Sequence, residues 1–397
     1  MSGAIAVLDS GASSIKFSLY EAGGVQVRAR GRFEAMHTAP RFVAKDEAGH
    51  VLAERTWPSG TPHGHDGAVD HIVGHLRGML GATPLAAVGH RVVHGGLLYD
   101  APVRVDARML SQLETFVPLA PLHQPHNLAP IRRLLERASE VAQVACFDTA
   151  FHRTQPEIAQ MFGLPRKYHD EGVRRFGFHG LSHAYAVRRG AELAGRPVAE
   201  LRIVTAHLGA GASLAAVLGG VSVDTTMGFT PLAGLVMNTR PGTLDPGLLL
   251  WLLEHGQVPL DELGDVLEHR SGLRGLSGTS GDLREVLAGR AAGDAACALA
   301  LDVYLHRLAR EAAAMAAATG GLDLLVLTGG VGEHAWQVRA GLAGALAHLG
   351  LGIDDDLNRA TTADGDITAP GATVRTVVVT AREDLEIRRQ VLGVLAG

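Results

Sequence analysis

The stretch Ile5-Ala-Val-Leu-Asp9-Ser-Gly-Ala-Ser-Ser-Ile-Lys16-Phe-Ser-Leu-Tyr20 begins with an apolar run, passes through Gly and Ser residues, and then alternates apolar with polar residues. A short apolar run and an alternation of period two are both typical of β-strands. The stretch therefore predicts two strands joined by a glycine turn, that is, a β-hairpin.

The same pattern recurs in the second half of the chain. The segment from Ile203 to Leu218 again combines strand, Gly/Ser turn and strand, and Gly11-Ala-Ser13 is repeated as Gly211-Ala-Ser213. The two copies are about half of the 397 residues apart. A duplicated α/β unit is the economical explanation of this repeat.

Between and after these hairpins, strand and helix patterns alternate. This alternation predicts an α/β protein whose sheets are covered by helices. A domain boundary is expected near residues 148–155. The predicted strands are 85–93, 141–147, 322–327 and 374–379, and the predicted helices are 127–138 (capped by Asn127), 181–193, 246–253, 294–319 and 383–395.

Composition excludes several classes of protein. The net charge of −5 argues against a nucleic-acid binder. The longest tempting apolar stretch, 248–253, is far shorter than the ~18 residues that a membrane span requires. The first residues lack the basic and apolar regions of a signal peptide, and two cysteines cannot build a disulfide framework. We therefore expect a soluble cytoplasmic protein with no membrane association.

The scarcity of lysine excludes further classes of site. Lys16, Lys45 and Lys167 are the three lysines, and none follows a glycine, so the chain has no P-loop. The S-x-x-K motif at 13–16 lacks the K-T-G partner of penicillin-binding enzymes, and no G-x-G-x-x-G Rossmann fingerprint occurs. His90 and His94 have the spacing of helical zinc ligands but lie in a predicted strand, so a zinc site is not expected.

Four glycine-rich turns follow predicted strands, at residues 9–14, 94–96, 209–213 and 328–332. Glycine lets backbone N–H groups approach an anion closely. Together the four turns favour a phosphate-rich ligand.

Several longer motifs resemble those of the acetate kinase (acetokinase) family, and they stay in order from residue 9 to residue 385. The motifs are Gly89-His-Arg-Val-Val-His-Gly-Gly96, Ala120-Pro-Leu-His-Gln-Pro125, Phe147-Asp-Thr-Ala-Phe-His152, Arg175-Phe-Gly-Phe-His-Gly-Leu-Ser-His183, Asp224-Thr-Thr-Met-Gly-Phe-Thr-Pro231, Thr239-Arg240, Leu244-Asp-Pro-Gly247 and Thr328-Gly-Gly-Val-Gly-Glu333.

The resemblance implies a fold, a reaction and partners. The fold is that of the acetate and sugar kinase/heat-shock/actin superfamily, with two duplicated ribonuclease-H-like (actin-like ATPase) domains and an interdomain nucleotide cleft. The expected domains are 1–150, completed by the C-terminal helix 384–397, and 151–383, which binds nucleotide and dimerises. The reaction is the reversible transfer of a phosphoryl group from ATP to acetate, giving acetyl phosphate and ADP, with Mg²⁺ (or Mn²⁺) in a homodimer.

The same resemblance assigns the catalytic residues. Arg91 and Arg240 match the active-site arginines, and guanidinium groups suit an anionic carboxylate that must approach an anionic phosphoryl group. His179 matches the histidine that donates to the phosphoryl oxygens. Asp148 matches a carboxylate that orients an arginine or a magnesium-bound water.

Further residues match positions around the reacting groups. Asp9 and Glu383 match the magnesium site. Val93, Leu122, Phe178 and Pro231 match the apolar pocket for the acyl methyl group, and His123, His207, Ser14 and Lys16 match other active-site positions. The residues that match ATP contacts are His207, Leu208, Gly209, Ala210, Gly211, Asp282, Leu283, Arg284, Gly330, Val331, Gly332 and Glu333.

The chain also departs from the family pattern. Asp9, Ala12, Ala210, His334 and Arg382 stand where the family usually has Asn, Ser, Asn, Asn and Asn. Two alternatives therefore stay open: a kinase for propionate or another short-chain carboxylate, and a nucleotide-binding member without catalysis. The intact pair of Arg91 and Arg240 favours an active kinase.

Overall fold

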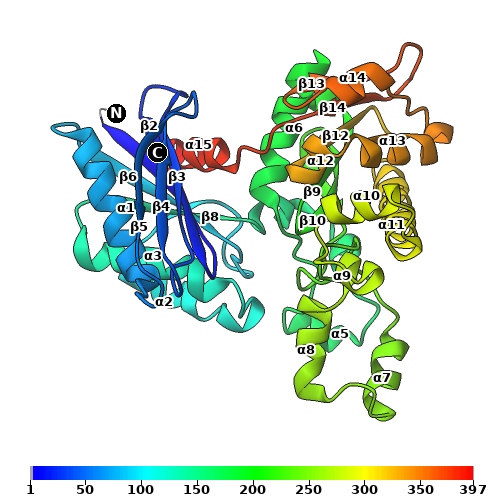
Figure 1. The fold of residues 1–397 in the computed structure, drawn as a ribbon, viewed down its shortest axis with the longest axis horizontal. Helices are drawn as coiled ribbons and strands as arrows, with labels where there is room; N and C mark the ends of the chain where they lie inside the picture. The colour runs from blue at the N-terminus through cyan, green and yellow to red at the C-terminus, as the bar shows by residue number, and fades with distance from the viewer. Residues whose placement is uncertain (1–2, 397) are drawn as a thin grey trace. The chain divides into compact units, whose positions relative to one another are not determined.

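The computed structural model describes residues 3–396, which form two compact units. The first unit runs to Phe151 and includes the chain from Arg382 onward, and the second spans His152–Ala381. Each unit is built on one β-sheet with helices packed on it (Figure 1). No helix within residues 3–396 combines the length and the apolar character needed to cross a membrane.

The first unit contains an eight-stranded sheet with the order β5-β4-β3-β2-β1-β6-β8-β7. Strands β1, β6 and β8 run parallel to one another, and the remaining neighbours pair antiparallel. The strands are β1 (Ala4–Ser10), β2 (Ser14–Glu21), β3 (Val27–Glu34), β4 (Arg41–Lys45), β5 (Val51–Thr56), β6 (Leu85–Val92), β7 (Val103–Arg104) and β8 (Ala142–Phe147).

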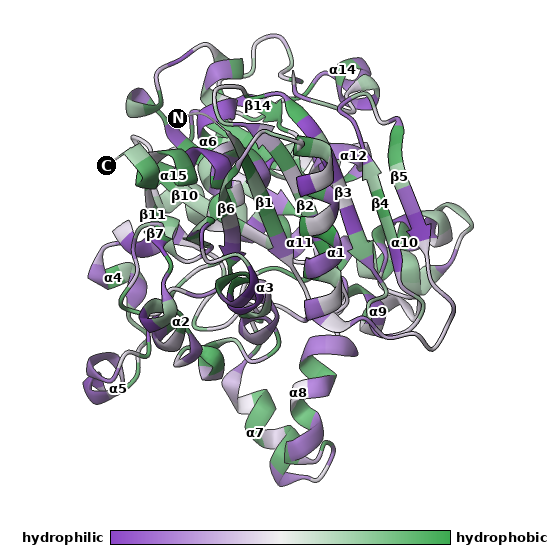
Figure 2. Ribbon diagram, turned by 90° about the vertical axis from the view of Figure 1, so that its left-hand side faces the viewer, coloured by the Kyte–Doolittle hydropathy of each residue, from purple (hydrophilic) through white to green (hydrophobic). Residues whose placement is uncertain are grey.

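Helices cover both faces of this sheet. Helices α1 (Gly64–Leu80) and α3 (Gln124–Arg137) pack on one face, and the C-terminal helix α15 (Glu383–Ala396) packs on the other against β1, β6 and β8. The central strands β1 and β6 are coloured mainly apolar in Figure 2, as expected for strands buried on both faces. The contact with α15 is so close that a Cβ on Gly89 would lie 2.5 Å from Ile387 Cγ2. Helix α2 (Ala107–Glu114) and a 3₁₀ turn at Val117–Leu119 precede α3.

The second unit contains a six-stranded sheet with the order β11-β10-β9-β12-β14-β13. Helix α6 contacts β9, β12 and β14, while α11 contacts β9, β10 and β11 (Figure 1). The strands are β9 (Arg202–Leu208), β10 (Ala212–Leu218), β11 (Val221–Thr225), β12 (Leu324–Thr328), β13 (Gly365–Asp366) and β14 (Arg375–Val378).

The remaining helices of the second unit surround this sheet or extend from it. They are α4 (Glu157–Gln160), α5 (Arg166–Asp170), α6 (Gly180–Ala194), α7 (Pro246–Glu254), α8 (Leu260–His269), α9 (Gly272–Ser277), α10 (Leu283–Ala291), α11 (Ala295–Ala318), α12 (Gly329–His334), α13 (Trp336–Ala345) and α14 (Asp355–Ala360).

Both predicted hairpins are confirmed as β1–β2 and β9–β10, and the α/β class is confirmed. One predicted helix start is wrong. Helix α3 begins at Gln124, and Asn127 lies inside its first turn rather than at its cap. The reason is that the Asn127 side chain is used elsewhere: its Oδ1 accepts from Val93 N at 2.9 Å and its Nδ2 donates to Ser10 O at 2.6 Å.

Candidate active site

In the first unit, the parallel strands bring three charged residues to one edge of the sheet. Leu8 of β1 pairs with His90 of β6, and Arg91 pairs with Cys146 of β8. Asp9, one residue after Leu8, and Asp148, two residues after Cys146, therefore lie near Arg91 at the carboxyl ends of neighbouring strands. Because side chains alternate between faces with period two, all three lie on the face that α15 covers.

Arg91 is held by two carboxylates. Its Nη2 donates to Asp148 Oδ2 at 2.7 Å and its Nε lies 3.1 Å from the same oxygen, while Nη1 is 3.3 Å from Asp9 Oδ1. Asp148 is fully buried, whereas the side chains of Arg91 and Asp9 keep 27% and 31% of their surface exposed. The arginine is thus oriented from the buried side and remains accessible on the other.

The charges around Arg91 keep it protonated. Burial opposes its charge, but attraction to Asp148, Asp9 and Glu383 outweighs burial and holds the pKa of Arg91 well above its ordinary value. Glu383, the first residue of α15, therefore belongs to the same cluster. Asp9 and Glu383 thus place carboxylate oxygens beside Arg91, a donor type that suits a hard cation.

The predicted metal residues Asp9 and Glu383 fit Mg²⁺ by the chemistry of their donors. Within residues 3–396, no group of three or more His, Cys, Asp or Glu side chains is arranged to hold a metal ion. Mg²⁺ is usually held by one or two carboxylates together with waters and substrate phosphates, so two carboxylates suffice.

The segment that leaves β6 is fixed by residues that the sequence analysis did not assign to the site. Gln124 Oε1 accepts from His94 N at 3.2 Å, and its Nε2 donates to His94 O at 3.0 Å. Thr149 Oγ1 accepts from Gly95 N at 3.0 Å. Gln124 lies within the motif at 120–125, but nothing in its spacing revealed that it would hold the backbone beside Val93.

In the second unit, His179 precedes helix α6 with a left-handed backbone (φ 57°), which is unfavourable for a residue other than glycine. Its Nδ1 lies 2.9 Å from Ser213 Oγ, and its ring stacks on that of His207 with 4.4 Å between the centroids. Strain of this kind often marks a functional position.

A buried histidine supports His179 from behind. His183 Nε2 lies 2.9 Å from the same Ser213 Oγ, and its Nδ1 lies 2.7 Å from Thr205 Oγ1. Burial, with the neighbouring His152 and His207, holds the pKa of His183 well below its ordinary value, so this ring is neutral. The i, i+4 spacing of His179 and His183 thus reflects a hydrogen-bonded chain.

Arg240 lies in a less negative environment than Arg91. Its Nη1 donates to Pro231 O at 3.0 Å, and Glu268 Oε2 is 3.5 Å from its Nε. Burial lowers the pKa of Arg240, and the attraction of Glu268 only partly opposes this. A mostly buried guanidinium whose one carboxylate partner lies 3.5 Å away is suited to bind an anion.

Arg240 and His179 converge on one glycine. A Cβ on Gly211 would lie 3.4 Å from His179 Nε2 and 3.6 Å from Arg240 Nη2. The turn at 209–211 therefore lies directly against the ends of both side chains.

The second glycine turn of this unit lies beside the first. Strands β9 and β12 are parallel and pair Thr328 with His207. Gly329 has φ 78°, and a Cβ there would lie 2.6 Å from Leu208 O, so the two turns can approach this closely only with glycine. The predicted ATP residues 207–211 and 330–333 are thereby brought together.

Four of the predicted ATP residues also have structural contacts. Glu333 is buried and its Oε1 accepts from Ala381 N at 3.0 Å. Leu283 is 4% exposed and packs in the core, whereas Asp282 caps α10 and pairs with Arg284 at 2.5 Å. Any contact of this segment with adenine would therefore involve the exposed neighbours of Leu283.

The other predicted residues are divided between the units. In the first unit, Val93 is buried and Leu122 is exposed. His123 directly precedes α3, and Lys16 pairs with Asp9 across the β1–β2 hairpin. Ser14 begins β2, and its carbonyl accepts from Gly11 N at 2.8 Å. In the second unit Phe178 is buried, and Pro231 is the residue that holds Arg240.

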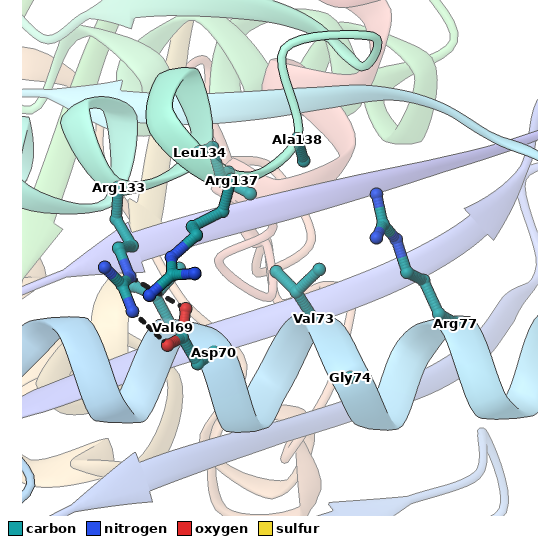
Figure 3. A pocket seen from close by; sticks show the side chains of 9 residues that line it. All are labelled: Val69, Asp70, Val73, Gly74, Arg77, Arg133, Leu134, Arg137 and Ala138. Carbon is teal, nitrogen blue, oxygen red and sulfur yellow. Dashed lines mark hydrogen bonds and ion pairs between the residues drawn. The ribbon is translucent and has the colours of Figure 1, made fainter.

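A cavity of about 310 Å³ lies elsewhere, between α1 and α3 (Figure 3). Val69, Val73 and Leu134 form its apolar floor, and the ion pair of Arg133 with Asp70 crosses one end. None of the residues predicted to bind acetate or ATP lines it.

Comparison with known proteins agrees with the motifs. A model of the acetokinase family matches residues 4–389. Acetate kinase of Rhodopseudomonas palustris (strain ATCC BAA-98 / CGA009) is 44% identical over 98% of both chains, and that of Deinococcus radiodurans is 41% identical over 98% of both.

Solved structures agree as well. The crystal structure of Porphyromonas gingivalis acetate kinase matches with a TM-score of 0.90 at 33% identity, covering 99% of this chain and 100% of that one. A propionate kinase from Francisella tularensis matches with a TM-score of 0.89 at 32% identity, covering 98% of each chain. This chain therefore belongs to the acetokinase family, whose members are phosphotransferases with a carboxyl group as acceptor.

Proposed function

We propose that this enzyme transfers the γ-phosphoryl group of ATP to acetate, with Arg91, Arg240, His179 and Asp148 as its catalytic machinery. A carboxylate oxygen of acetate attacks the γ-phosphorus in line, the bond to the β-phosphate oxygen breaks, and acetyl phosphate and ADP leave. The observation that carries the proposal is a buried carboxylate that orients one accessible arginine, in a chain that belongs to this family.

Arg91 is assigned to the carboxylate and to the transferring phosphoryl group. Both are anions, so their approach is opposed by repulsion, and phosphoryl transfer is catalysed mainly by positioning and charge neutralisation. Asp148 accepts from both Nε and Nη2 of Arg91 and so fixes the plane of the guanidinium. A guanidinium group that is already oriented loses little conformational entropy when it binds an anion.

His179 and Arg240 are assigned to the phosphoryl oxygens. If the hydroxyl of Ser213 donates to His179 Nδ1, the neutral His179 carries its proton on Nε2 and can donate it to a phosphoryl oxygen. The neutral His183 supports this arrangement, since it can donate from Nε2 to Ser213 while accepting from Thr205. Arg240 adds a positive charge beside the same glycine.

We assign ATP to the glycine turns at 207–211 and 330–333, to the segment 282–284, and to Ser14 and Lys16 of the first hairpin. Asp9 and Glu383 would hold Mg²⁺, with Mn²⁺ as the alternative. When bound, the metal neutralises charge on the donor phosphates. The aspartate at position 9 orients Arg91 as well, so one carboxylate serves both the arginine and the metal site.

The acyl pocket is assigned to Val93, Leu122, Phe178 and Pro231. Propionate differs from acetate by one methylene, which a hydrophobic pocket discriminates by only about 1–3 kcal/mol. The similar propionate kinase structure shows that the fold does not decide between the two acids.

The acceptor series decides the substrate. Acyl phosphate formation would be measured as the hydroxamate with acetate, propionate and butyrate, each over a range of concentrations. We expect the highest kcat/KM with acetate. A higher kcat/KM with propionate would identify propionate, and not acetate, as the preferred substrate. ATP binding without formation of any acyl phosphate would favour a non-catalytic member of the family.

We also propose a cytoplasmic homodimer. The apolar side chains Leu250, Trp251 and Leu260 of α7 and α8 are 58%, 49% and 76% exposed, as expected of a surface that a second copy covers. Cys146 and Cys297 are free buried thiols, which suits a reducing compartment. Sedimentation at micromolar protein concentration tests whether the protein is a dimer. A monomer at this concentration would contradict the proposal.

A further inference from the structure

Four consecutive carbonyls, from the last residue of β1 through the turn that follows it, are each bound by a donor, and the donors come from three parts of the first unit. Ser10 is buried, whereas Gly11, Ala12 and Ser13 are exposed, and exposed carbonyls need no protein partner because water satisfies them. The bonds are Asn127 Nδ2 to Ser10 O at 2.6 Å, His65 Nε2 to Gly11 O at 2.9 Å, His37 Nε2 to Ala12 O at 3.2 Å, and Met36 N to Ser13 O at 3.3 Å.

The two histidines must act as donors. A carbonyl oxygen can only accept a hydrogen bond, so the proton of both His37 and His65 is on Nε2. The ring of His65 also stacks on that of His126 in the first turn of α3, with 4.9 Å between the centroids and 13° between the planes. His65 therefore lies between the turn and helix α3.

The segment that carries these histidines is itself held firmly. Met36 is fully buried, and its carbonyl accepts from His63 N at 2.9 Å and Gly64 N at 3.3 Å. The loop with His37 and the start of α1 with His65 are thus joined at one backbone position. Ala35, before this loop, has φ 53°, a conformation that alanine adopts only when its surroundings impose it.

The bonds to the carbonyls determine where the N–H groups point. In a planar trans peptide, C=O and N–H point in opposite directions. The peptides after Gly11 and Ala12 therefore direct the N–H groups of Ala12 and Ser13 away from His65 and His37. Neither N–H has a protein acceptor within residues 3–396, and both residues are exposed. Successive N–H groups turned to one side form an anion-binding concavity.

We propose that His37 and His65 are positioning residues that hold the turn at 10–13 so that the N–H groups of Ala12 and Ser13 face the phosphates of the nucleotide. This proposal rests on the proposed function, because it assigns this turn to the phosphate side. Ala12 has no side-chain donor of its own, so the orientation of the backbone N–H groups determines what this turn offers to an anion. The two histidines contact the backbone carbonyls of the turn and would act through its orientation.

The test compares ATP with adenosine, which shares the base and ribose but has no phosphates. Binding of each to His65→Leu, His37→Leu and the double variant would be measured by calorimetry, and initial rates with varied ATP and varied acetate would give kcat and both KM values. We expect His65→Leu to weaken ATP binding by up to about tenfold, the upper end for the loss of one hydrogen bond, with a smaller effect for the more exposed His37. Adenosine affinity and KM for acetate should stay within about twofold.

Two further variants keep the result interpretable. His65→Gln places an amide N–H near the position of the imidazole Nε2 and should restore ATP binding, whereas a loss caused by misfolding would not be rescued selectively. His50→Leu is the matched control, since His50 is exposed and its Nδ1 contacts Asp46 at 2.9 Å, away from the turn.

Each outcome decides the proposal. Unchanged ATP binding in the double variant would overturn it, and so would an equal loss of ATP and adenosine binding or a failure of His65→Gln to restore ATP binding. If His65→Leu does not fold, the ratio of ATP affinity to adenosine affinity in His37→Leu and His65→Gln is used instead. If the wild type binds ATP but forms no acyl phosphate, the proposed function fails while the binding comparison still judges the histidines.

Discussion

At the scale of single residues, Arg91 and Arg240 differ in a way that the sequence does not show. Both are arginines in an Arg-rich chain, yet Arg91 contacts two carboxylates while Arg240 contacts a carbonyl and one more distant carboxylate. Arg91 is therefore strongly oriented and charge-compensated, and Arg240 carries an incompletely compensated charge. We therefore expect replacement of Arg91 and replacement of Arg240 to differ in their effect on stability.

Replacing Arg91 with Ala should lower kcat/KM by about 10³-fold or more, by analogy with arginines that stabilise transferring phosphoryl groups. It should also destabilise the first unit, because Asp148 would be left buried without its partner, at a cost of about 3–5 kcal/mol. Hydroxamate assays and urea denaturation measure the two effects. Arg104→Ala, at the exposed position of β7, is the control. A loss of kcat/KM below tenfold in Arg91→Ala would contradict the catalytic role of Arg91.

Replacing Arg240 with Ala should lower kcat/KM by a similar factor with a smaller loss of stability. Glu268, the carboxylate left behind, is 3.5 Å away and its side chain keeps 19% of its surface exposed, so water can solvate it. Arg270→Ala is a matched control from the same unit, since Arg270 pairs with Glu262 and Asp265 at the surface. Activity of Arg240→Ala near that of the control would contradict the assignment.

At the scale of elements, the register of parallel strands assembles the site. Asp9, Arg91 and Asp148 follow or end strands β1, β6 and β8, and Glu383 begins the helix that packs on them. The position of Glu383 therefore depends on how α15 fits the sheet. At Gly89, α15 leaves no room for a side chain.

Gly89→Ala should destabilise the protein by about 1–3 kcal/mol, because its Cβ would lie 2.5 Å from Ile387 Cγ2 and 2.7 Å from Val391 Cγ2. It should also lower activity through the displacement of Glu383. Gly78→Ala, in α1 with open space around it, should be neutral or stabilising by up to about 1 kcal/mol. Denaturation midpoints of the two variants check this, and equal midpoints would show that α15 adapts to the added methyl group.

At the scale of the whole molecule, buried neutral histidines make stability depend on pH. Burial lowers the pKa of His90 to about 3 and those of His94 and His152 to about 4, and holds that of His183 well below its ordinary value. The unfolded chain binds protons at these groups from about pH 6.5 downward, while the folded chain does not. The unfolded state thus holds more protons below pH 6.5, and stability must fall as pH falls.

Between about pH 6.5 and pH 4, we expect the free energy of unfolding to decrease with a slope of up to about 5 kcal/mol per pH unit, the value for four protons. The melting temperature measured at pH 7.5, 6.5, 5.5 and 5.0 would show a decline that steepens below 6.5. Replacing His183 with Gln should reduce this slope by the contribution of one of the four protons. A melting temperature independent of pH over this range would mean that these histidines are protonated in the folded state.

The sequence by itself determined the local elements and the family. Both hairpins, the helices at 181–193 and 294–319 and the α/β class follow from periodicities of two and 3.6 residues, which each segment carries on its own. Short motifs identified the family because they lie in order along the chain. Arg91 and His179 could be selected in the same way.

Tertiary structure alone decided which distant residues meet. The four bonds to residues 10–13, the role of Asn127 inside α3, and the hydrogen-bonded chain through His183 join segments between 22 and 117 positions apart. No local period encodes such contacts, because they depend on strand register and on how helices pack. The sequence could therefore point to Arg91, while only the fold shows the carboxylates that orient it and the histidines that hold the turn beside it.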